Sequence, residues 1–172
     1  IPVKVTGEKG IFRTPRFSPD GKNIVYVKDD GNDHQGFTHS VNPGIYSIPA
    51  KGGIPILVVK QGNSPYYSTD GKRIFFMEQE SEKKLLSSIG IDGKEKQNHF
   101  TSKYATSIVP SPDNKWVSFI EFYKVYVSPF LPSGKSMELS GANKSFPVAQ
   151  TAKDNGMSLH WSADAKKICW SS

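Results

Sequence analysis

One short unit recurs four times along the 172-residue chain, and this repetition limits the possible folds more than any other feature. In each copy an apolar segment ends in serine, an aspartate follows two residues later, and a second apolar segment begins soon after it. The aspartates are spaced 50, 43 and 51 residues apart, and the blades of a four-stranded propeller recur at about 40–50 residues. The four copies are Pro15–Tyr26, Pro65–Phe76, Val109–Phe119 and Leu159–Trp170.

Each copy is predicted to be a strand, a tight turn and a second strand. The serine hydroxyl can bond nearby backbone N–H groups, and a short polar residue such as aspartate is favoured in the turn. The next residue needs a positive φ, which glycine adopts freely and asparagine tolerates. Ala165 fits this position poorly, at a cost of roughly 1 kcal/mol, so we expect the fourth turn to be the least regular. The residues predicted to have this structural role are Asp20, Gly21, Asp70, Gly71, Asp113, Asn114 and Asp164.

A second hairpin is predicted after each of the first three copies, because a glycine-bearing turn separates two β-rich runs there. Two hairpins per repeat make four antiparallel strands, which is one blade. The sequence therefore predicts an all-β propeller of four-stranded antiparallel blades, with about three whole blades and two partial ones, as a fragment of a larger propeller. A small closed ring is the alternative. The paired runs are Gly44–Pro49 with Ile54–Val59, Leu85–Ile91 with Glu95–Phe100, and Lys124–Phe130 with Ser136–Leu139.

The chain is predicted to be a single propeller segment over residues 1–172. Its expected parts are an outer strand of a preceding blade in 1–10, blades in 11–60, 61–103 and 104–145, and a partial blade in 146–172. Open blade faces and unpaired strand edges would expose apolar surface in such a segment.

Composition argues against several classes of function. The net charge of +6 comes from 22 basic and 16 acidic residues, and the basic residues are scattered, whereas a nucleic-acid-binding protein concentrates them on one face. No apolar run approaches the roughly 18 residues of a membrane span. The single cysteine, Cys169, lies in an apolar run and is expected to be a buried structural thiol. No Gly-rich phosphate loop precedes a predicted helix, so we expect no cofactor.

The turn Ser18-Pro19-Asp20-Gly21-Lys22 between two apolar strands resembles the repeat of TolB-like β-propellers. The resemblance covers essentially the whole chain and implies the propeller fold, related in shape to WD-repeats although the Trp-Asp dipeptide is missing. It also implies a periplasmic or secreted location.

Three other stretches look like the propeller part of TolB-like amidohydrolases: residues 31–46, 99–105 and 159–164. In that family a downstream metal-binding barrel carries the chemistry. This chain has no His-x-His motif of that barrel, so the resemblance implies that catalysis would lie outside these residues.

The long polar connection Lys28–Pro43 is the best candidate for a functional loop, because function tends to concentrate on long loops held by rigid scaffolds. Its weak candidates for metal ligands are Asp33, His34 and His39, although no third ligand at a standard spacing is identifiable. The alternative is a loop that packs on a neighbouring blade or domain, and this is the interpretation we favour. His99 and His160 lie near strand ends and are expected to be structural.

Five aromatic residues could form either a recognition surface or the packing between blades. Their period-two spacing favours the core interpretation. These residues are Tyr66, Tyr67, Tyr104, Phe122 and Tyr123.

No complete catalytic arrangement can be identified, because the serines belong to the repeat turns. The leading hypothesis is a non-catalytic propeller module for protein–protein interaction or scaffolding, whose partner is a protein or a downstream domain of the same polypeptide. An alternative is the N-terminal propeller part of a metal-dependent amidohydrolase. A third is a sugar-acting or metal-dependent enzyme built on the propeller face.

Overall fold

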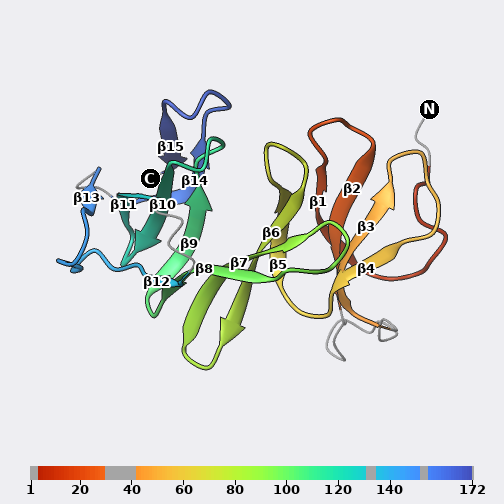
Figure 1. Ribbon diagram of the computed structural model, residues 1–172, viewed down its shortest axis with the longest axis horizontal. Helices are drawn as coiled ribbons and strands as arrows, with labels where there is room; N and C mark the ends of the chain where they lie inside the picture. Colours follow the sequence, from red (N-terminus) through yellow and green to blue (C-terminus); the bar gives the residue numbers. More distant parts are fainter. Residues whose placement is uncertain (1–3, 30–41, 131–134, 152–154, 172) are drawn as a thin grey trace. The chain divides into compact units, whose positions relative to one another are not determined.

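The computed structural model describes residues 4–29, 42–130, 135–151 and 155–171, and every regular element among them is a β-strand (Figure 1). The chain divides into two compact units. The first comprises Ile1–Glu78 and Ser87–Gln97, and the second comprises Gln79–Leu86 and Asn98–Ser172. No helix long and apolar enough to cross a membrane occurs among the described residues.

The first sheet belongs to the first unit and has four antiparallel strands in the order β1-β2-β3-β4. Successive residues of a strand point to opposite faces, so Val25 and Tyr26 lie in separate apolar clusters. Val5 packs with the Tyr26 cluster, although Lys4 and Val5 are in no strand. The strands are β1 (Phe12–Phe17), β2 (Asn23–Lys28), β3 (Gly44–Pro49) and β4 (Ile56–Val59).

The second sheet has the order β12-β8-β7-β6-β5, in which β5 to β8 form the expected blade. The division between the two units falls within β6, β7 and β8. A fifth strand, β12, runs parallel to β8. The strands are β5 (Asn63–Tyr67), β6 (Arg73–Glu80), β7 (Lys83–Gly90), β8 (Gln97–Ser102) and β12 (Met137–Glu138).

The third and fourth sheets belong to the second unit. The third has the order β13-β11-β10-β9, and the fourth is a pair, β14-β15. Their shared apolar cluster contains Ile120, Val125 and Leu159. The strands are β9 (Ala105–Pro110), β10 (Trp116–Glu121), β11 (Lys124–Pro129), β13 (Ala149–Gln150), β14 (Met157–Trp161) and β15 (Ile168–Ser171).

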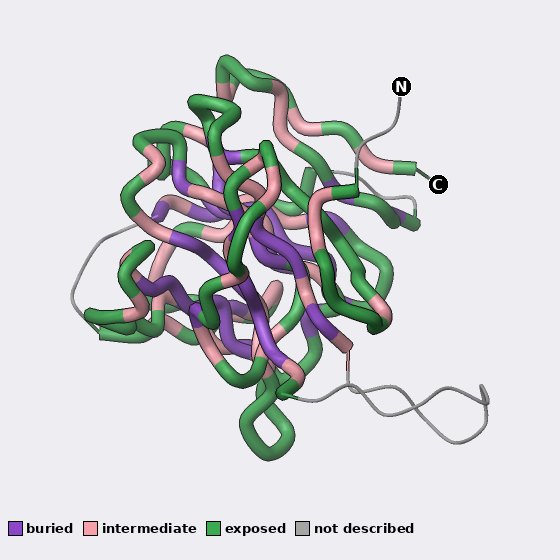
Figure 2. The backbone as a smooth tube through the Cα atoms, turned by 90° about the vertical axis from the view of Figure 1, so that its right-hand side faces the viewer, coloured by how far each residue is buried: buried purple, intermediate pink, exposed green. Residues whose placement is uncertain are grey.

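The prediction of an all-β chain made of four-stranded antiparallel blades is confirmed. In Figure 2 the buried stretches of the chain lie on the inside, while its outermost bends are exposed. Exposed connections between buried segments are usual in proteins, because connecting segments run over the surface.

One strand assignment is wrong. The run Ser136–Leu139 was expected to be the outer strand of the third blade, but β12 pairs with β8 of the second blade and β13 takes the outer position. Leu139 is buried and its N–H donates to the carbonyl of Thr101 over 2.7 Å. Pairing between segments so far apart in the chain leaves no mark on local sequence periodicity, which indicates only hairpins between neighbouring runs.

The prediction of a buried thiol is also wrong, because Cys169 is exposed. It lies on β15 opposite His160, whose carbonyl oxygen is 3.8 Å from its sulfur. Among the described residues this sheet has two strands only, so no further strand covers its outer positions.

Candidate interaction surface

The four repeat turns share one hydrogen-bond pattern. In each, the serine Oγ donates to the aspartate Oδ1 over 2.6 Å. The same Oδ1 accepts the N–H of the residue two positions later, and the serine Oγ accepts the N–H of the residue five positions after the serine. The serine–aspartate pairs are Ser18–Asp20, Ser68–Asp70, Ser111–Asp113 and Ser162–Asp164.

These hydrogen bonds act on the acidity of the aspartates. The serine hydroxyl stabilises the charged form, and so lowers the pKa of each aspartate below its ordinary value. A backbone N–H adds to this effect in every turn. One oxygen of each carboxylate is therefore engaged within its own turn.

The residue after each aspartate has a positive φ, with values of 70° for Gly21 and Gly71, 54° for Asn114 and 59° for Ala165. The expectation that the fourth turn would be the least regular is wrong. Ala165 adopts the same conformation because the Ser162–Asp164 hydrogen bonds and the bond from the Ala165 N–H to the Ser162 carbonyl fix the turn.

The other candidates from the sequence give no assembled site. Asp33, His34 and His39 lie outside the described residues. Among the residues that are described, no three or more His, Cys, Asp or Glu side chains gather as a metal site would require. The ring of His99 packs near Phe130, with centroids 5.5 Å apart.

A surface of another kind occurs in the second unit, where three aromatic side chains stand in solvent. Tyr104 is 50% exposed, Phe122 65% and Tyr123 64%. The rings of Tyr104 and Phe122 are 5.0 Å apart and tilted by 35°. We call these three residues the aromatic surface. The core interpretation is therefore wrong for them, whereas Tyr66 and Tyr67 are partly buried as it requires.

The turn that carries two of these rings has an unfavourable backbone. Phe122 and Tyr123 connect β10 to β11, and their φ values are 48° and 65°. Two-residue hairpin turns with both central residues at positive φ strongly prefer Asn-Gly. For bulky residues this conformation is a genuine outlier and costs about 1–2 kcal/mol each.

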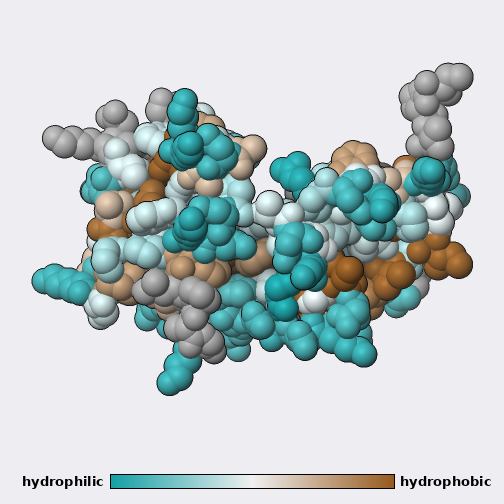
Figure 3. Space-filling model, turned by 45° about the horizontal axis from the view of Figure 1, so that its top comes forward, coloured by the Kyte–Doolittle hydropathy of each residue, from teal (hydrophilic) through white to brown (hydrophobic). Residues whose placement is uncertain are grey.

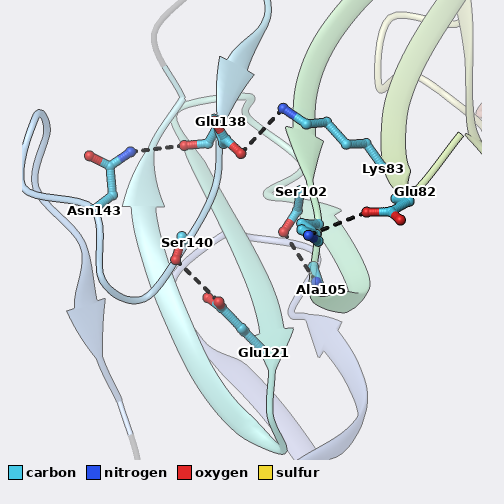
Figure 4. A network of polar contacts seen from close by, with 9 residues as sticks. Glu82, Lys83, Ser102, Ala105, Glu121, Glu138, Ser140 and Asn143 are labelled. Atoms are coloured by element: carbon cyan, nitrogen blue, oxygen red, sulfur yellow. Dashed lines mark hydrogen bonds and ion pairs between the residues drawn. The ribbon is translucent and has the colours of Figure 1, made fainter. Parts of the chain in front are cut away.

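Three hydrogen bonds hold this turn in place. The carboxylate of Glu121, which is 4% exposed, accepts hydrogen bonds from Ser140 Oγ at 3.1 Å and from the Gly141 N–H. Figure 4 shows the pair of Glu121 and Ser140. On the other side, the Tyr123 carbonyl accepts the Gly156 N–H over 2.6 Å. The strained turn is thus anchored from both flanks, as persistent strain requires.

Tyr104 is positioned by a second turn, between β8 and β9. The buried Ser102 accepts the N–H of Ala105 through its Oγ at 3.1 Å, which closes the turn (Figure 4). Lys103 contacts both Glu82 and Tyr104. Its Nζ is 3.3 Å from Glu82 Oε2 and 5.6 Å from the Tyr104 ring centroid. A cation at this distance from a ring face is attracted to it.

The aromatic surface offers flat apolar faces beside an ion pair. Aromatic faces of this kind are enriched in surfaces that recognise a macromolecular partner. Sequence reasoning missed the anchoring residues Glu121, Ser140 and Gly156. The pair Phe122-Tyr123 between two β-rich runs was a usable signal for a hairpin turn, but it lacks the glycine or asparagine that marks one.

Comparison with known proteins gives a fold but no sequence family. No family profile matches the chain, and no curated protein is similar to it. TolB from Acinetobacter baumannii is 20% identical with a TM-score of 0.64, over 94% of this chain and 37% of TolB. An oligogalacturonate lyase in complex with manganese is 11% identical with a TM-score of 0.63, over 93% of this chain and 44% of the lyase.

A chain of a nidogen/laminin complex is also similar, at 16% identity and a TM-score of 0.58, over 94% of this chain and 56% of the matched one. The chain thus spans less than two thirds of each of these three structures. At such identities the likeness concerns the fold alone. The chain has the fold of the TolB-like β-propellers.

Proposed function

We propose that this chain is a non-catalytic TolB-like β-propeller module that binds a partner protein through the aromatic surface. The observation that carries the proposal is the turn Phe122–Tyr123, in which two exposed bulky aromatic residues are held at positive φ. Strained residues of this kind cluster at binding and switch sites.

Stability alone gives no reason for these residues. An Asn-Gly pair would relieve the strain of the turn, and polar residues would avoid the exposed rings. Aromatic residues are enriched in protein interfaces, where they bury a large area with few rotatable bonds. A rigid turn also reduces the entropy that is lost on binding. The retained cost is therefore explained by a partner that covers Tyr104, Phe122 and Tyr123.

The partner is a separate protein or a downstream domain of the same polypeptide, and the compartment is periplasmic or secreted. The similarity to a chain of a nidogen/laminin complex supports a separate protein as the partner, since that chain is found in a protein assembly. The amidohydrolase alternative also predicts that the chain is inactive by itself. It differs in placing a metal-binding barrel downstream of these blades.

An enzymatic role for the chain is tested directly. The lyase with the same fold was found in complex with manganese. Manganese is therefore the metal to test. Because we propose a non-catalytic module, we expect the purified chain to bind no manganese in equilibrium dialysis and to leave ester, amide and glycosidic test substrates uncleaved. Stoichiometric metal or turnover would overturn the non-catalytic assignment.

The binding role is tested by photo-crosslinking in cells. A benzoylphenylalanine residue replaces Phe122 or Tyr104 in the full chain, and Trp116, 44% exposed on β10, carries it as the matched control. We expect a discrete protein adduct from positions 122 and 104 and none from 116. Adducts of equal yield from all three positions, or from none, would contradict the proposal.

A further inference from the structure

A second surface, independent of the aromatic one, lies at the outer edge of the first sheet. The strand order places β4 at this edge. Just before and within it, Ile54 is 86% exposed and Ile56 65% exposed, and Leu57 is also exposed. Hydrophobic surface gathers at the right of Figure 3, on the side where β4 lies in Figure 1. A bare edge strand with apolar side chains is a template for pairing with another strand.

Only part of β4 is free. Val58 is buried, and its carbonyl oxygen faces Gly93, 3.4 Å from where a Cβ on that glycine would stand. Pro55 has no N–H to donate. Ile56 and Leu57 therefore form the open part of the edge.

The same chain shows what such an edge accepts. In the second sheet the outer strand β8 is extended by β12, a strand of two residues. Met137 pairs with Phe100, and Leu139 is buried beside it with its N–H on the Thr101 carbonyl. Pairing over two residues is thus enough to add a strand to an edge in this chain.

The added strand is apolar and acidic in alternation. Between the apolar Met137 and Leu139, Glu138 forms an ion pair with Lys83, with 3.4 Å between Oε1 and Nζ (Figure 4). Asn143 also holds this segment, because its side-chain amide donates to the Glu138 carbonyl over 2.9 Å. The carboxylate matches a lysine on the blade that receives it.

The edge at β4 also has lysines that could pair with carboxylates of an added strand. The run from Gly52 to Val59 carries no charge, and Lys51 and Lys60 stand at its two ends, both exposed. Within the described residues neither lysine has an ion-pair partner. An extended segment with an apolar centre and carboxylates at its ends would complement this edge in both hydrophobicity and charge.

A second copy of the chain fits less well. A second copy would bring its own Lys51 and Lys60 to an edge whose run from Gly52 to Val59 holds no acidic residue, so the pairing would gain no ion pair. The added like charges would repel each other and make strand pairing less favourable. The observations therefore favour a different chain with acidic ends.

We infer that the outer edge of the first blade, at Ile56 and Leu57, binds an extended acidic-ended segment of a partner protein by strand addition. The backbone edge supplies hydrogen bonds, Ile54 and Ile56 cover its apolar side chains, and Lys51 and Lys60 pair with its carboxylates. The chain's own β12 on β8 is the internal precedent.

The test uses the full chain and a capped probe peptide, Glu-Val-Thr-Ile-Thr-Val-Glu, with a matched peptide that has lysine at both ends. Fluorescence anisotropy measures affinity, and hydrogen exchange maps protected amides. We expect the glutamate-ended peptide to bind at least about tenfold more tightly. It should also slow exchange of the one amide in the Ile56–Leu57 pair that points away from β3, because successive N–H groups of a strand point to opposite edges. Ile56→Lys should weaken binding at least about tenfold, whereas Trp116→Lys, at an exposed site on β10, should not.

A charge-reversed variant, Lys51→Glu with Lys60→Glu, should instead prefer the lysine-ended peptide. Circular dichroism establishes that each variant is folded. Equal binding of both peptides, protection at another strand, or no binding by the folded chain would overturn the inference. A dimer in sedimentation velocity that Ile56→Lys abolishes would also overturn it, in favour of self-pairing.

Discussion

Ser162 Oγ donates a hydrogen bond to Asp164 Oδ1 over 2.6 Å, the same distance as in the other three repeat turns. The fourth turn alone has alanine where the others have glycine or asparagine, yet Ala165 keeps a φ of 59°. The serine–aspartate pair therefore sets the conformation of the turn, and the following residue adapts to it even at a cost.

Ala165→Gly is expected to stabilise the chain. Glycine adopts this φ without a Cβ clash, which relieves about 1 kcal/mol, and the more flexible unfolded state offsets part of the gain. Urea unfolding should therefore show a free energy of unfolding higher by up to about 1 kcal/mol. Ala163→Gly, two positions earlier in the same turn and not at positive φ, is the control and should destabilise. A loss of stability in both variants would contradict strain at Ala165.

The four turn aspartates predict an acid-sensitive fold. The serine hydroxyls lower the pKa of each folded carboxyl below its ordinary value of 3.8, so the unfolded chain binds protons more readily. Their contribution to stability is complete above that pH and is lost as the pH falls through the folded-state values. Urea midpoints measured from about pH 7 to about pH 2.5 should drop below pH 3.8.

The matched variant for this titration is Asp20→Asn with Asp70→Asn, which keeps the shape of both turns without their charge. It should be less stable than the wild type at neutral pH and should approach it in acid. Parallel curves for the two proteins across the whole range would show that these carboxylates do not govern the acid sensitivity.

Tyr66→Phe is expected to leave stability unchanged or to raise it by about 1 kcal/mol. The Tyr66 hydroxyl is buried and has no hydrogen-bond partner among the described residues, and burial raises its pKa strongly. Its removal keeps the stacking on Phe75, whose ring centroid is 5.4 Å away. The control is Tyr67→Phe, which loses a 2.8 Å hydrogen bond to Ser47 and should cost about 1 kcal/mol. Thermal unfolding of the two variants measures both effects. An equal loss of stability in Tyr66→Phe and Tyr67→Phe would mean that the Tyr66 hydroxyl has a hydrogen-bond partner.

Phe122→Asn combined with Tyr123→Gly is expected to stabilise the chain and to abolish partner binding. The new pair is the preferred one for a turn with two positive φ values, and it should raise the free energy of unfolding by about 2 kcal/mol. Phe122→Ala removes one ring but keeps the strain, so it should weaken binding without this gain. Denaturant unfolding measures the first effect, and loss of the crosslinked adduct from position 104 measures the second. An unchanged or lower stability of the double variant would show that the turn is not strained.

Local sequence was sufficient for the turns and for most hairpins. Serine, aspartate and glycine act within five residues of one another, so a motif such as Ser68–Arg73 contains every side chain that its turn needs. The strands beside it follow from short apolar runs, as in the consecutive buried residues Ile74, Phe75 and Phe76. Blade boundaries depend on the same local signals and remain predictions.

Long-range contacts were beyond these signals. Met137 pairs with Phe100 across 37 positions of the chain, and a strand of two residues has no measurable periodicity. The exposure of Cys169 depends on how many strands its sheet has, which an apolar run does not reveal.

The sequence by itself determined the repeat, its turn chemistry and the all-β class, because the groups that decide them are neighbours along the chain. Only the tertiary structure decided that Tyr104, Phe122 and Tyr123 face solvent and that β12 pairs with β8, while no strand of the described part of the chain pairs with the outer edge of β4. Period-two spacing gives the face of a strand on which a side chain lies. Whether that face or edge is covered depends on segments far away in the sequence.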